Sequence, residues 1–160
     1  MLTICALPLR AAGERWTTET DIPTAPRPQA TVTNPHGDKL LVFADQDGHV
    51  MTQFISASPV SLNKSSCPTF QVDQRQPPHS FPISQRCRVE GHQALVEIAA
   101  LSGRKLESRV LYEFINGSRI AFRFTTQDGA YHERSFSLSR SKQAIAAALG
   151  DNLQILSSPR

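Results

Sequence analysis

The chain has 160 residues and eleven prolines, which indicates one domain with a hydrophobic core and favours loops and strand edges over long helices. Its net charge of +3 is too mild for the dense basic stripe of a nucleic-acid binder, so we expect no nucleic-acid partner. No apolar run approaches the ~20 residues of a membrane-spanning helix, and we therefore expect no transmembrane span.

Residues 1–13 resemble the end of a secretory signal peptide. A short apolar stretch is followed by the small residues Ala11, Ala12 and Gly13, which are typical of a cleavage site, although the usual basic start is missing. The segment is therefore interpreted as a truncated signal peptide. The alternatives are a first strand over residues 2–7, or a lipoprotein cysteine at Cys5.

Residues 14–38 are rich in proline and favour extended or irregular backbone, which Trp16 is expected to anchor to the domain. The stretches 39–44 and 49–56 predict the first hairpin. Residues 45–48, Asp-Gln-Asp-Gly, are typical of its turn. No closing glutamate follows at the spacing that a calcium loop needs, so we expect no metal there.

Two strands are predicted around cysteines. Residues 66–73 contain Cys67 and residues 83–89 contain Cys87, with a proline-rich surface crossover over 74–82 between them. Two cysteines, an even number, in an exported domain indicate one disulfide. Through loop closure this bond would stabilise the fold by about 3 kcal/mol. Because a disulfide needs Cα atoms within about 7 Å, we expect these strands to lie side by side. The alternative is two separate buried thiols in a cytosolic protein.

The remaining chain predicts one more strand, two helices and a second hairpin. The strand covers residues 92–99. The first helix, of about two to three turns, lies within 102–116, with Glu113 on its solvent face and Gly117 just beyond its end. The hairpin and the last helix occupy residues 118–150, with alternating apolar residues on both strands, an Asp-Gly turn, a serine N-cap and a left-handed stop at Gly150.

These elements predict a mostly β fold, an antiparallel β-sandwich or barrel-like sheet with two short helices. We place a single β-rich domain over residues 39–156, with a frayed tail at 157–160. The five histidines show no ligand spacing, and no phosphate loop, dinucleotide fingerprint or nucleophile elbow is present. We therefore expect no enzyme, no metal and no cofactor. A constellation of His132, Asp128 and Ser137 is too common a composition to indicate catalysis.

Basic residues outnumber acidic residues by eight to four between residues 101 and 142. Three of them, Arg119, Arg123 and Arg134, are predicted to share the outer face of the last hairpin. There they would meet an anionic lipid, a glycan or an acidic protein. The alternative is a solvated strand face that discourages edge pairing.

The second half of the chain resembles a known family. The order is Cys87, the strand Gln93-Ala94-Leu95-Val96-Glu97-Ile98, a helix ending at Asn116-Gly117, the strand Arg119-Ile120-Ala121-Phe122-Arg123-Phe124, then Asp128-Gly129, Phe136-Ser137-Leu138-Ser139 and Ala144-Ile145. This order is similar to that of the invasion-associated locus B family of bacterial exported proteins, over roughly residues 39–150.

The resemblance implies a β-rich protein of the periplasm, the outer membrane or the secreted fraction of a Gram-negative bacterium, without known catalysis. The function we expect is that of a non-enzymatic, virulence-associated accessory protein linked to host-cell interaction, with an unknown protein, lipid or glycan partner. The alternative is a periplasmic binding module that uses the arginine-rich hairpin. A third class is a hydrolase with an unrecognised site.

Overall fold

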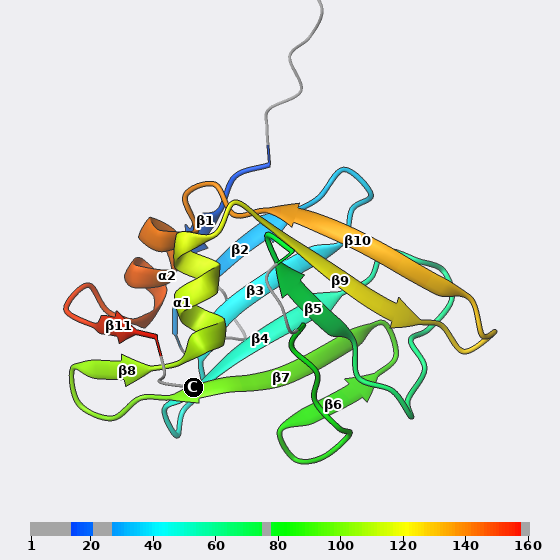
Figure 1. Cartoon of the computed structure of the whole chain (residues 1–160), viewed down its shortest axis with the longest axis horizontal. Helices are drawn as coiled ribbons and strands as arrows, with labels where there is room; N and C mark the ends of the chain where they lie inside the picture. The colour runs from blue at the N-terminus through cyan, green and yellow to red at the C-terminus, as the bar shows by residue number, and fades with distance from the viewer. Residues whose placement is uncertain (1–13, 21–26, 75–77, 158–160) are drawn as a thin grey trace, which may run out of the picture.

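The computed structural model describes residues 14–20, 27–74 and 78–157 (Figure 1). The signal-like segment 1–13 and residues 158–160 of the predicted tail lie outside the described residues. Within the described ranges the elements are β1 Thr17–Glu19, β2 Gln29–Thr33, β3 Lys39–Ala44, β4 His49–Ile55, β5 Thr69–Val72, β6 Cys87–Glu90, β7 Gln93–Ala100, β8 Lys105–Glu107, α1 Arg109–Asn116, β9 Arg119–Thr125, β10 Tyr131–Ser137, α2 Ser141–Leu149 and β11 Gln154–Leu156.

Six strands form an antiparallel sheet in the order β1-β2-β3-β4-β7-β6. Its centre is the first predicted hairpin, β3 and β4, which the structure confirms. Asp45 fixes the turn, because its Oδ1 accepts hydrogen bonds from the backbone N–H groups of Asp47 and His49. The aspartates of residues 45–48 therefore serve turn chemistry.

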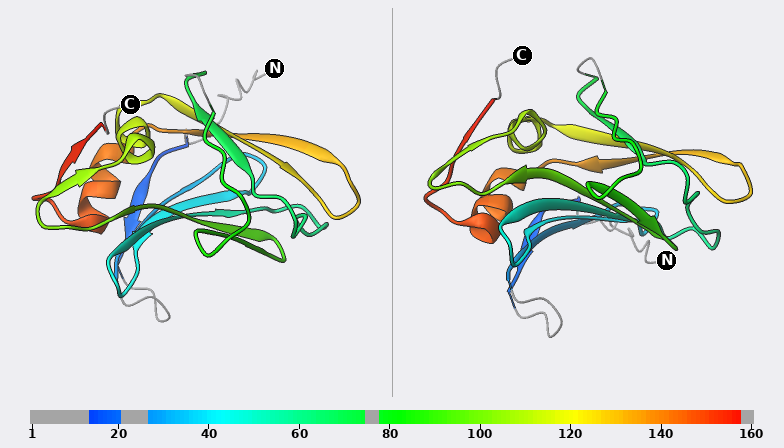
Figure 2. Two further views of the ribbon diagram at one scale, coloured as in Figure 1. Left: turned by 60° about the horizontal axis from the view of Figure 1, so that its bottom comes forward. Right: turned by 90° about the horizontal axis from the view of Figure 1, so that it is seen from below.

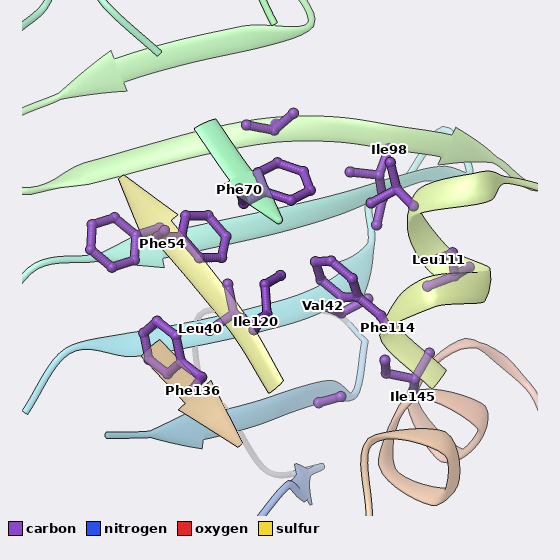
Figure 3. Close-up of a cluster of buried hydrophobic side chains, with 14 of the residues drawn as sticks. Leu40, Val42, Phe54, Phe70, Ile98, Leu111, Phe114, Ile120, Phe136 and Ile145 are labelled. Atoms are coloured by element: carbon purple, nitrogen blue, oxygen red, sulfur yellow. The ribbon is translucent and has the colours of Figure 1, made fainter. Parts of the chain in front are cut away.

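A smaller antiparallel sheet, in the order β10-β9-β5, lies over the first (Figure 2). The second predicted hairpin, β9 and β10, is confirmed. The two layers meet through aromatic rings: Phe54 of the large sheet stacks on Phe122 of β9 at a centroid distance of 5.2 Å. It also meets Phe136 of β10 edge to face at 6.1 Å (Figure 3). Such offset contacts add stability to that of burial alone. The sheets are not closed into a barrel, so the predicted mostly β fold takes its sandwich-like form.

Both helices lie together at one end of the two layers (Figure 2). Helix α1 has eight residues and ends at Asn116, which confirms the predicted helix of two to three turns within residues 102–116. It begins at Arg109, after the N-cap Ser108, whose Oγ accepts from the N–H of Leu111. Residues Lys105–Glu107 instead form β8, which pairs in parallel with β11. The sequence pattern missed β8, because Leu106 is buried equally well in a helix or in a strand.

Helix α2 begins differently from the prediction. Arg140 is at the N-cap position with a left-handed backbone, φ 65°, and makes no capping hydrogen bond, so the expected serine cap is wrong. Ser141 lies one residue inside, where its Oγ donates to the Phe114 carbonyl at 2.7 Å. This serine therefore fastens α2 to α1. Gly150 ends the helix at φ 127°, a backbone angle that favours glycine.

The described residues 14–20 and 27–38 include the strands β1 and β2, and β2 pairs with β3 inside the large sheet. The sheet thus continues across residue 39, where the sequence placed the start of the domain. Trp16 is the predicted anchor: it is buried, and its Nε1 donates to the Ser137 carbonyl at 2.8 Å. The extended entry segment is held against β10 in this way. None of the helices that the described residues form is long and apolar enough to cross a membrane.

Candidate functional site

A polar hollow of about 340 Å³ opens on the outer face of the small sheet. Residues from all three strands line it, among them Gln71 of β5, Arg119, Ala121 and Arg123 of β9, and Glu133 and Ser135 of β10. None of the described histidines or cysteines is among its lining residues. The side chains around the hollow are therefore mainly charged or hydrogen-bonding ones.

The strand register explains why a hollow forms there. Ala121 pairs with Gln71 on one side and with Ser135 on the other, so two of the three side chains in the middle row are small. Arg119 and Arg123 lie two residues before and after Ala121 on the same strand and point to the same face. Short side chains between two long ones leave a depression with a cation at each end.

Arg123 is held in place by its neighbours. Its Nε donates to Glu133 Oε2 at 2.8 Å, and its Nη1 donates to Gln71 Oε1 at 3.1 Å. The Glu133 carboxylate balances the charge of Arg123, and the pair forms one wall of the hollow. Being half-exposed, this ion pair contributes more to geometry than to stability.

The other end of the hollow has a different charge balance. The Asp73 carboxylate accepts hydrogen bonds from the backbone N–H groups of Ser118 and Arg119 at 2.9–3.1 Å. Asp73 and Gln74 have left-handed backbones, φ 49° and 56°, which allows the chain to turn under these amides. The Arg119 guanidinium is exposed, and within the described part of the chain no ion-pair or hydrogen-bond partner satisfies it.

The prediction that three arginines share the outer face is wrong for Arg134. In the hairpin register Arg134 pairs with Phe122, a buried residue of the opposite face. Its Nε lies 3.2 Å from Asp38 Oδ2 in the interior between the sheets. The sequence contained the signal, because Arg134 lies two residues before Phe136, which was predicted to point inward.

The structure joins Cys67 and Cys87, the predicted pair, in a disulfide with Cα atoms 6.5 Å apart. The expectation of neighbouring strands is wrong, however. Cys67 precedes β5 of the small sheet, whereas Cys87 begins β6 of the large sheet. The disulfide therefore ties the two layers of the sandwich together.

A cluster around the buried carboxylate of Glu113 was missed by the sequence patterns. Glu113, predicted to face solvent, is 5% exposed, and its carboxylate oxygens lie 2.7 Å from His79 Nε2 and 3.0 Å from Arg109 Nε. His79 also pairs with Phe70 through backbone hydrogen bonds in both directions. The crossover predicted to run over the surface is thus pinned to α1 at His79.

The constellation of His132, Asp128 and Ser137 is not assembled. In the alternation of β10, Ser137 belongs to the outer face and His132 to the inner face, where His132 stacks on Phe124. Asp128 instead accepts hydrogen bonds from the Thr126 hydroxyl and the Ala130 N–H, and these lower the pKa of its carboxyl group. These contacts stabilise the hairpin turn.

In the part of the chain that the structure describes, no group of three or more His, Cys, Asp or Glu side chains is arranged to hold a metal ion. No protein-family model matches the chain, and neither a curated protein nor a solved structure matches it. The resemblance to the invasion-associated locus B family stays a prediction that rests on the quoted motifs.

Proposed function

We propose that this protein is an exported, non-catalytic accessory protein of a Gram-negative bacterium that binds an anionic partner on the outer face of its small sheet. The observation that carries the proposal is the Arg119 guanidinium, exposed at one end of a polar hollow. Glu133 and Gln71 hold Arg123, at the other end of the hollow, in place before any ligand arrives, which reduces the ordering cost of binding there.

Two further observations support parts of this proposal. The Cys67–Cys87 disulfide is compatible with an oxidising compartment such as the periplasm or the extracellular space. The resemblance of residues 39–150 to exported invasion-associated proteins supports a role at the bacterial surface, linked to host-cell interaction. Of the three predicted arginines, only Arg119 and Arg123 contribute to the binding face in this proposal.

Binding is tested with immobilised heparin, oligohexuronate, polyglutamate and anionic lipid vesicles as probes. We expect at least one probe to bind, with an affinity that falls as salt increases. Arg119→Gln should weaken that binding about tenfold or more, because a charge-assisted hydrogen bond is lost. Arg88→Gln is the matched control, since Arg88 is exposed on β6 of the opposite layer.

Equal binding by the parent protein, Arg119→Gln and Arg88→Gln would contradict the proposed anion site, and so would the absence of binding to every probe. Export is tested separately by fractionating cells that express the protein from its natural start. Protein in the periplasm should begin at or near Glu14. Intact Met1 in the cytosol would contradict export, and turnover in a hydrolase substrate screen would contradict a non-catalytic role.

A further inference from the structure

We infer that the anionic partner is an acidic oligosaccharide, bound with one carboxylated ring in the hollow over Ala121 and a ring further along the same sugar chain on Tyr131. This inference rests on the proposed function, because it assigns a ligand class to the same face. Three properties of the face favour it over other anions: an exposed aromatic ring in line with the hollow, hydrogen-bonding groups of both kinds, and a low net charge.

Tyr131 is 64% exposed, more than any other large apolar side chain in the described ranges. In the alternation of β10 it belongs to the outer face and precedes Glu133, a wall of the hollow, by two residues. Its cross-strand partner is Thr125, which is too small to cover the ring. An aromatic ring offers a flat apolar surface with a polar hydroxyl at its edge. The C–H face of a sugar ring is complementary to such a surface.

The walls of the hollow contain both donors and acceptors. Arg119 and Arg123 only donate, the Glu133 carboxylate only accepts, and the Ser135 hydroxyl does both. A sugar presents hydroxyl groups that donate as well as accept, so it can use all four side chains. Fully ionised phosphate or sulfate groups have only acceptor oxygens and would leave Glu133 facing like charge.

The charge balance sets the number of anionic groups that fit. Glu133 balances Arg123, and the backbone amides that bind the Asp73 carboxylate stabilise its charge where it lies. Arg119 then remains as the cation for one incoming carboxylate. A polymer with several charges on each repeat unit, or an anionic membrane, would place several negative charges against Asp73 and Glu133, which is unfavourable.

The size of the site is consistent with this class. A volume of about 340 Å³ is at the lower end of the range for small-molecule sites, roughly 300–1,000 Å³. Its polar walls suit a hydrated ring and do not suit a lipid chain. Tyr131 lies beyond the wall formed by Glu133 and about 13 Å along β10 from Ser135, so an oligosaccharide would extend over more than two rings toward the hairpin tip.

The test uses an oligosaccharide of hexuronic acid and its methyl ester, which removes the charge and keeps the ring. Isothermal titration should show that the acid binds at least about tenfold more tightly than the ester. Arg119→Gln should abolish this difference. Tyr131→Ala should lower the affinity for both the acid and the ester about tenfold without changing the salt dependence of binding. Tyr131→Phe should retain the affinity of the parent protein. Tyr112→Ala, at a partly exposed tyrosine on α1, is the control.

Two outcomes separate this inference from the proposed function. If polyglutamate or anionic vesicles bind better than the oligohexuronate, with loss on Arg119→Gln and no effect of Tyr131→Ala, the anion site stands and the saccharide assignment is overturned. If no anionic probe binds, both are overturned. Equal affinity for the acid and its ester would also contradict the carboxylate contact at Arg119.

Discussion

The guanidinium of Arg134 lies 3.2 Å from the carboxylate of Asp38, which is only 1% exposed. This ion pair links β10 of the small sheet to the turn between β2 and β3 of the large sheet. Asp38 also accepts hydrogen bonds from Asn34 Nδ2 and from the Ala57 N–H. Of the three arginines predicted for one surface, this one therefore joins the two layers.

Arg134→Gln is expected to lower the stability of the fold. The substitution leaves the Asp38 carboxylate with two neutral hydrogen-bond donors, so the free energy of unfolding should fall by about 2 kcal/mol. This is less than the roughly 3–5 kcal/mol lost when a buried charge keeps no partner. Urea unfolding measures this difference. The control Arg119→Gln, at an exposed side chain, should change stability by no more than about 0.5 kcal/mol. Equal stabilities of the two variants would contradict a structural role for Arg134.

The sequence predicted those elements whose pattern is local. Hairpins β3–β4 and β9–β10 were found because alternating residues and Asp-Gly turns lie within a few residues of each other. The pairing of β8 with β11 was missed, because nothing near Leu106 signals a partner strand some 50 residues later in the chain. The sequence likewise predicted irregular backbone where β2 lies, because prolines precede and follow this short strand. Its main-chain hydrogen bonds depend on pairing with β3.

The candidate site was predicted in part. Arg119 and Arg123 follow from alternation along one strand, but the hollow depends on Gln71 of β5, which sequence patterns did not pair with β9. The burial of Glu113 was not predicted either, because it depends on His79, which comes from a distant loop. Such contacts arise from the tertiary arrangement, and helical periodicity alone cannot show them.

Gly117→Ala is expected to destabilise the protein by overpacking. Gly117 has φ −86°, an angle that alanine also adopts, so no backbone strain arises. A Cβ atom there would lie 2.8 Å from the Glu113 carbonyl oxygen and 3.0 Å from Leu138 Cδ1, and would also meet Val72. Overpacking of this kind typically costs about 1–3 kcal/mol. Thermal unfolding followed by circular dichroism would measure it.

Gly91 provides the matched control for this steric effect. A Cβ at Gly91 meets nothing within 4 Å, although its φ of 57° disfavours alanine. Gly91→Ala should therefore cost about 1 kcal/mol, through backbone strain alone. A smaller loss for Gly117→Ala than for Gly91→Ala would contradict the close packing around Gly117.

Removal of the disulfide is expected to lower stability by about 3 kcal/mol, because the unfolded chain regains the freedom of a loop of some 20 residues. Cys67→Ser with Cys87→Ser should unfold at lower denaturant than the parent protein. Mass spectrometry of the unreduced parent should show one peptide pair that contains both cysteines. Alkylation of both thiols in protein from an oxidising compartment would contradict the bond.

The Asp128 carboxyl group is expected to titrate below its ordinary range. Hydrogen bonds from the Thr126 hydroxyl and then from the Ala130 N–H favour its ionised form and lower its pKa. Its contribution to stability is therefore present above the unfolded pKa of about 3.9 and is lost as pH falls through the lower folded pKa. Thr126→Val should raise the Asp128 pKa in an NMR titration. An unchanged pKa would contradict this assignment.

The disulfide between the layers also affects how the protein responds to proteases. A single cut in the backbone between Cys67 and Cys87 leaves two fragments that remain covalently joined. For a cut after β5, the pairing of β5 with β9 also joins the two fragments, and β6 keeps its pairing with β7 inside the C-terminal fragment. Nicked molecules would therefore migrate with the intact chain on a gel until a reductant is added.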